Sequence, residues 1–118
     1  MNLKDQIEAL NNELEVPIPQ HPEEIINRMS ELASYMAIAA ELKGRGKEAL
    51  ERAKLGALKG CDMKQSPSII RMIIDGKTAE EQGDYVQIDR INSFLTTQSE
   101  MCRSVLSWKK EELNHRID

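Results

Sequence analysis

The chain has 118 residues, a formal net charge of −4, two cysteines and four aromatic residues. A chain of this length forms one domain with a small hydrophobic core. The negative net charge argues against a nucleic-acid-binding surface over the whole molecule. The number and placement of the two cysteines do not suggest a disulfide framework, and their spacing is not typical of metal ligands. With no signal-peptide pattern and no apolar run of about 18 residues, the expectation is a cytoplasmic protein that does not enter a membrane.

Residues 1–15 predict a short amphipathic helix that needs a partner surface. Its apolar residues recur at spacings of four, three and four: Leu3, Ile7, Leu10 and Leu14. Three prolines then make residues 16–22 an extended linker. The remaining residues, 23–118, are expected to form the helical bundle domain.

The apolar residues from Ile25 to about Leu58 repeat at helical spacing and predict one long helix. Its predicted inward side consists of Ile25, Met29, Leu32, Met36 and Ala39. A strip of small residues beside that side would let another helix approach closely: Ala33, Ala37, Ala40 and Gly44. Gly44 and Gly46 weaken the middle of the helix, and a continuous or kinked helix is favoured over a break.

Residues 60–65 read as a loop, after which Ser66 and Pro67 form a good helix start. This short helix is expected to end at Gly76. Residues 78–81 have the pattern of a capping box that opens the last long helix, which runs to Leu113. Three large residues widen the apolar side of that helix beyond what one partner helix would cover: Phe94, Met101 and Trp108.

The two long helices set the predicted architecture. A helix of about 37 residues is roughly 55 Å long, whereas a compact globule of this chain length has a radius of gyration of about 13–14 Å. We therefore expect an all-α antiparallel hairpin of two long helices with two short helices, a bundle completed by homo-oligomerisation, most simply as a two-fold dimer. The residues expected in its core or its oligomer interface are Ile25, Met29, Leu32, Met36, Tyr85, Ile88, Leu95, Val105 and Trp108.

Charge is unevenly distributed along the chain. Residues 43–64 carry seven basic and three acidic side chains, and residues 75–100 carry six acidic and two basic ones. These stretches are expected to face each other in a hairpin or an oligomer. A second interpretation is that the basic side chains bind a nucleotide or a single-stranded nucleic acid, although no aromatic residue lies among them for stacking. The candidate phosphate ligands are Lys43, Arg45, Lys47, Arg52, Lys54 and Lys59.

No nucleophile-elbow, phosphate-loop or dinucleotide motif is present in the sequence, so no catalytic residue and no cofactor is predicted. Two acidic pairs offer an enzymatic alternative: Glu48 with Glu51, and Glu81 with Asp84. These pairs resemble the acidic motifs of all-helical MazG-type nucleotide pyrophosphohydrolases. The resemblance implies that the four carboxylates would hold Mg²⁺ against a nucleoside triphosphate.

Three segments together resemble small all-helical accessory proteins of bacterial phages and prophages: residues 34–43, 66–70 and 103–112. This resemblance spans most of residues 25–113 and implies a role in binding a host or phage protein. Because amphipathic surface is abundant and no catalytic set converges, the leading prediction is a non-enzymatic protein-interaction and oligomerisation module.

Overall fold

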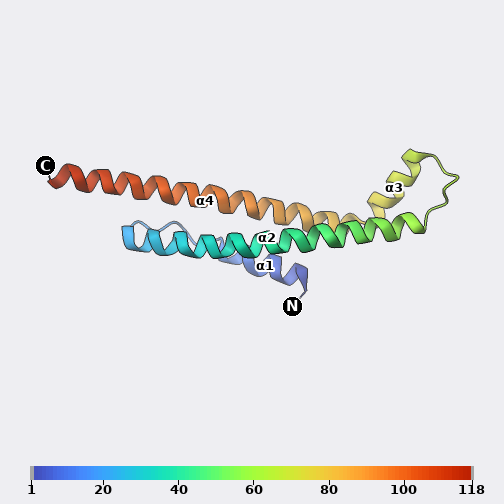
Figure 1. Cartoon of the computed structure of the whole chain (residues 1–118), viewed down its shortest axis with the longest axis horizontal. Coiled ribbons are helices and arrows are strands. Elements are labelled where there is room, and N and C mark those ends of the chain that lie inside the picture. The colour runs from blue at the N-terminus through green and yellow to red at the C-terminus, as the bar shows by residue number, and fades with distance from the viewer. Residues whose placement is uncertain (1, 118) are drawn as a thin grey trace.

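The computed structural model describes residues 2–117, and the side chains of residues 2–115. Met1 and Asp118, at the outer limits of the predicted segments 1–15 and 23–118, lie outside the described residues. The described chain forms four helices, α1 (Leu3–Glu13), α2 (Pro22–Lys59), α3 (Pro67–Lys77) and α4 (Ala79–Ile117). They build a rod with extents of 78 × 29 × 17 Å (Figure 1). The prediction of an all-α fold with two long and two short helices is confirmed.

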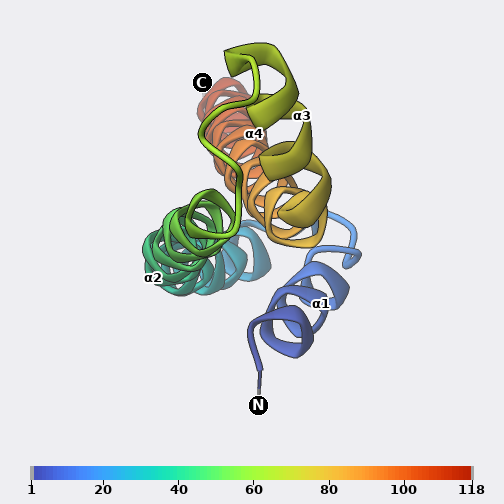
Figure 2. The same cartoon turned by 90° about the vertical axis from the view of Figure 1, so that its right-hand side faces the viewer.

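The long helices α2 and α4 run antiparallel along the rod, and α4 extends beyond the start of α2 (Figure 1). Viewed from its end, the rod shows α1 in the angle between α2 and α4 (Figure 2). One apolar cluster joins these three helices. Its buried members are Ile7, Leu10, Leu14, Ile25, Leu32, Ala39, Leu42, Ile88, Ile91, Leu95 and Cys102.

The helix α2 is continuous through its two central glycines, as predicted. Gly46 is buried, and a Cβ atom at this position would lie 2.8 Å from Cδ1 of Ile88 on α4. A Cβ atom at Gly44 would have no neighbour within 4 Å. Gly46 is therefore the residue that lets the two long helices approach closely, whereas Gly44 faces open space.

The short helix α3 begins as predicted, because Ser66 Oγ accepts a hydrogen bond from the backbone N–H of Ile69 at 3.4 Å and Pro67 follows it. Its predicted end at Gly76 is wrong, since α3 continues to Lys77. Gly76 also lacks the positive φ of a glycine helix stop. The helix continues because Thr78 supplies the stop instead.

Thr78 is the single residue between α3 and α4, and it is fully buried. Its hydroxyl donates to the carbonyl of Ile74 at 2.8 Å and accepts a hydrogen bond from Nε2 of Gln82 at 3.2 Å. The predicted capping box over residues 78–81 is therefore wrong, because the Thr78 hydroxyl bonds to Ile74 and Gln82 instead. The start of α4 at this point is nevertheless as predicted. The Thr78 hydroxyl closes the end of α3 rather than capping the first turn of α4.

A polar latch holds the C-terminal end of α1 against the hairpin. Arg28, with 4% of its surface exposed, donates from Nη2 to the carbonyl of Glu13 at 3.1 Å and from Nη1 to Oε2 of Glu31 at 3.0 Å. Gln98 on α4 donates to the carbonyl of Leu14 at 3.3 Å. Carbonyl groups at the end of α1, which have no partner within their own helix, are thus bonded by side chains of both long helices.

Candidate interaction surfaces

Three large apolar side chains of α4 form an exposed row, which we call the α4 stripe: Phe94, Met101 and Trp108. Their exposed fractions are 46%, 49% and 61%. Seven residues make almost two full helical turns, so the three side chains lie along one side of α4. Cys102 follows Met101 by one residue and faces the core, which turns the stripe away from α2. The outer side of α4 therefore presents a row of exposed apolar side chains, in which Nζ of Lys109 lies 5.2 Å from the ring centroid of Trp108.

The residues predicted for the core or the oligomer interface fall into three groups in the structure. Ile25, Leu32, Ile88 and Leu95 are buried in the chain's own core. The half-buried residues are Met29, Met36, Tyr85 and Val105. Trp108 is the member that the structure places at the surface, where it can meet another molecule.

The strip of small residues on α2 is also exposed. It consists of Ala33, Ala37, Ala40 and Gly44. We expected another helix to pack closely against this strip, but α1, α3 and α4 of the same chain do not cover it. The close helix contact of α2 occurs instead at Gly46, as described above.

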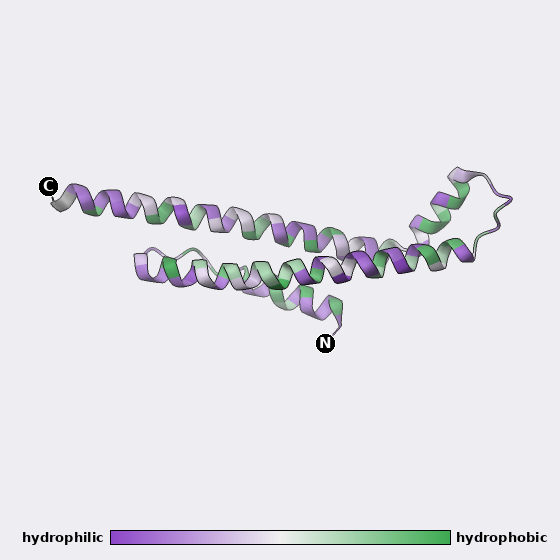
Figure 3. Cartoon of the chain, in the orientation of Figure 1, coloured by the Kyte–Doolittle hydropathy of each residue, from purple (hydrophilic) through white to green (hydrophobic). Residues whose placement is uncertain are grey.

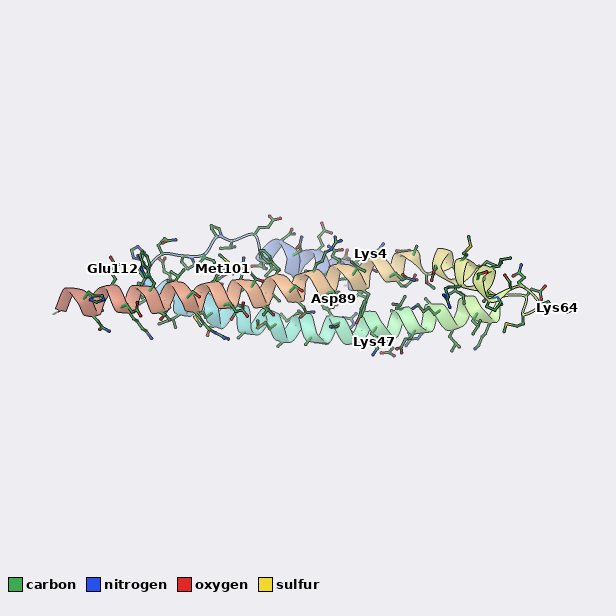
Figure 4. The ribbon with its side chains drawn as sticks, turned by 90° about the horizontal axis from the view of Figure 1, so that it is seen from above. Lys4, Lys47, Lys64, Asp89, Met101 and Glu112 are labelled. Carbon is green, nitrogen blue, oxygen red and sulfur yellow. The ribbon has the colours of Figure 1, made fainter. Side chains whose placement is uncertain are left out.

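The basic stretch and the acidic stretch meet across the hairpin at one ion pair. Nζ of Lys43 lies 3.1 Å from Oδ1 of Asp89, and this hydrogen bond raises the pKa of Lys43. Figure 4 shows Asp89 and Lys47 on the two neighbouring long helices. Among the other candidate phosphate ligands, Arg45 bonds to Gln6 of α1 and Arg52 pairs with Glu48 on its own helix. Lys43, Arg45 and Arg52 are thus bonded to three separate partners, whereas Lys47, Lys54 and Lys59 are exposed.

The four acidic residues of the enzymatic alternative occupy different environments. Glu48 pairs with Arg52 at 2.7 Å, and Glu51 is exposed. Glu81 and Asp84 are half-buried near α1, where burial raises the pKa of Asp84. In the part of the chain that the structure describes, no three His, Cys, Asp or Glu side chains are grouped so that they could hold a metal ion. The four carboxylates of the enzymatic alternative therefore do not form such a group.

Comparison of the chain with protein-family models, curated proteins and solved structures finds no match. The hydropathy of the described helices likewise gives none of them a segment able to cross a membrane. The rod itself is a helical hairpin with an apolar stripe on one long helix.

Proposed function

We propose that this chain is a non-enzymatic helical interaction module that forms a homodimer through the α4 stripe. The observation that supports this most directly is the row of exposed residues at seven-residue spacing, Phe94, Met101 and Trp108. Helices that pair along a common seam repeat apolar residues at two positions in every seven, and the stripe supplies one of these positions. Large aromatic and methionine side chains are also the residue types enriched in protein interfaces.

The stripe has a spacing that suits a two-fold axis. Phe94 and Trp108 each lie seven residues from Met101, so an antiparallel pair of α4 helices centred on Met101 places Phe94 against the partner's Trp108. Such a pairing would bury six large side chains, at about 1.5–3 kcal/mol for each one that is fully buried. Association also costs translational and rotational freedom, and the expected dimer is therefore of moderate affinity.

The proposal includes a partner from outside the chain. A role as a phage or prophage accessory protein that binds a host or phage protein agrees with the abundant exposed apolar surface. The nucleotide-binding and pyrophosphohydrolase alternatives are not preferred, because Lys43, Arg45 and Arg52 are bonded to separate partners and no three acidic side chains among the described residues are grouped as metal ligands.

Sedimentation equilibrium tests the dimer. The wild-type chain is expected to have twice the mass of one chain at micromolar concentrations, and Met101→Glu is expected to have the mass of one chain because it places a charge at the centre of the seam. Thr96→Glu is the matched control, since Thr96 is exposed on the same helix but lies off the stripe. A wild-type monomer, or a dimer that Met101→Glu leaves intact, would contradict the proposal.

A further inference from the structure

The end of the rod opposite the C-terminus is formed by α3, the loop before it and the end of α2 (Figure 1), and these segments include hydrophobic residues (Figure 3). We call residues 54–77 the tip; they comprise the last turns of α2, the loop and α3. No residue of α3 is fully buried, although five of its eleven residues are isoleucine or methionine. Met72 on α3 and Met63 in the loop are 73% and 69% exposed. The packing of α3 on α2 therefore covers only part of its apolar side.

A groove runs between the end of α2 and α3, with a volume of about 740 Å³. Half-buried isoleucines and an exposed methionine give it an apolar lining, and its charged lining residues are Lys54, Arg71 and Asp75. The residues around it are Lys54, Met63, Gln65, Pro67, Ile70, Arg71, Ile74 and Asp75. Methionine is flexible and polarisable, which suits a surface that must adapt to a bound side chain.

The tip is positively charged on a molecule that is negative overall. Residues 54–77 carry five basic and two acidic side chains, whereas the whole chain has a net charge of −4. Among the described residues, Lys54, Lys59, Lys64 and Arg71 form no ion pair. Of the two acidic residues, Asp62 accepts a hydrogen bond from the backbone N–H of Lys64 within the loop. Lys64 lies at the far end of the rod (Figure 4).

We infer that the tip binds an acidic amphipathic helix of a partner protein, with the apolar side of that helix in the groove and its carboxylates against Lys54 and Arg71. A concave apolar groove fits a helix, whereas a lipid surface is flat. The absence of Trp, Tyr and Phe from residues 54–77 removes the usual anchors for a membrane interface and the usual platforms for stacked bases. The inference gives the chemistry of the protein partner in the proposed function and does not depend on the dimer.

A labelled synthetic peptide with leucines on one side and glutamates on the other is the probe, and fluorescence anisotropy is the readout. We expect the peptide to bind the 118-residue chain, with an affinity that falls as salt concentration rises. Arg71→Glu and Met63→Glu should each weaken binding at least about tenfold. Both side chains are exposed, so the fold should be retained. Arg103→Glu, a charge reversal on α4 away from the tip, should leave binding unchanged.

Three further arms use the same peptide with lysine in place of glutamate, vesicles of anionic phosphatidylglycerol, and a single-stranded oligonucleotide. Absence of glutamate-peptide binding, equal binding of the lysine peptide, or tip-dependent binding of vesicles or oligonucleotide in place of the peptide would overturn the inference. Met101→Glu separates the two proposals, because it should abolish the dimer and leave peptide binding intact. Loss of peptide binding in that variant would count against an independent tip site.

Discussion

At the scale of single residues, substitutions at the two central glycines of α2 should have opposite effects on the free energy of unfolding. Gly44 faces open space, so Gly44→Ala should raise the free energy of unfolding by about 1 kcal/mol through helix propensity. Gly46 contacts α4, so Gly46→Leu should lower it by about 1–3 kcal/mol by overpacking the helix crossing at Ile88. Urea denaturation followed by circular dichroism measures both. A stabilising Gly46→Leu would show that α2 and α4 do not approach closely there.

The half-buried carboxyl group of Asp84 predicts a pH effect. Burial raises its pKa, and the charges of Glu80 and Glu81 raise it further, while Lys4 lowers it. A raised carboxyl pKa in the folded state means that stability present at low pH is lost as pH rises through that pKa. Asp84→Asn should therefore be more stable than the wild type at pH 7, and the difference should vanish at about pH 3. Thermal unfolding at the two pH values measures it.

Glu80 is a control for Asp84, because its pKa is shifted in the opposite direction. Its hydrogen bond from Lys4 lowers the pKa of Glu80, so its contribution to stability is present at neutral pH and is lost on acidification. Glu80→Gln should accordingly weaken the docking of α1 slightly at pH 7. An equal response of Asp84→Asn and Glu80→Gln to pH would show that burial does not distinguish the two carboxyl groups.

At the scale of the helices, α1 depends on the polar latch. An isolated helix of its length is marginal in water, so its order comes from docking on α2 and α4. Arg28→Ala removes the charged donor to the carbonyl of Glu13 and should destabilise the docked state of α1 by about 2–3 kcal/mol. In this variant, hydrogen exchange of residues 3–13 should speed up relative to the wild type, and by more than exchange in the centre of α2. Arg103→Ala is the surface control, and unchanged protection of α1 in Arg28→Ala would contradict the latch.

The order, type and approximate limits of the helices could be predicted from the sequence, because apolar spacing, prolines and the Ser66 cap are local signals. The end of α3 could not, since Thr78 closes that helix through a contact that depends on how α4 leaves it. Arg28 was missed as a buried residue, although its place between Ile25 and Leu32 on the apolar side was a usable signal. An arginine there has to be bonded inside the fold, and its partners come from other helices.

The surfaces were predictable to a smaller extent. The width of the apolar side of α4 indicated that Phe94, Met101 and Trp108 exceed the needs of one partner helix, and all three are exposed. The tip was not predicted, because the apolar residues of α3 resemble a core segment when only sequence is considered. Their exposure follows from the position of α3 at the end of the rod, where α2 and α4 cover it from one side only.

At the scale of the whole molecule, the two proposed surfaces lie on different parts of the rod. The C-terminal half of the α4 stripe lies toward one end, and the tip forms the other (Figure 1). A dimer formed through the stripe would leave both tips accessible. Two tips on one dimer could bind two copies of a partner, which would raise the overall affinity if both copies belong to one assembly.

The elongation of the rod also affects how its size is read in solution. The radius of gyration is 20.8 Å, a value that a globular protein reaches at about 370 residues. A single extended chain therefore has the radius of gyration of a compact particle of about three times its mass. The number of chains in the particle therefore has to be determined by a method that measures mass. The dimensions of one elongated chain alone resemble those of an oligomer of compact chains.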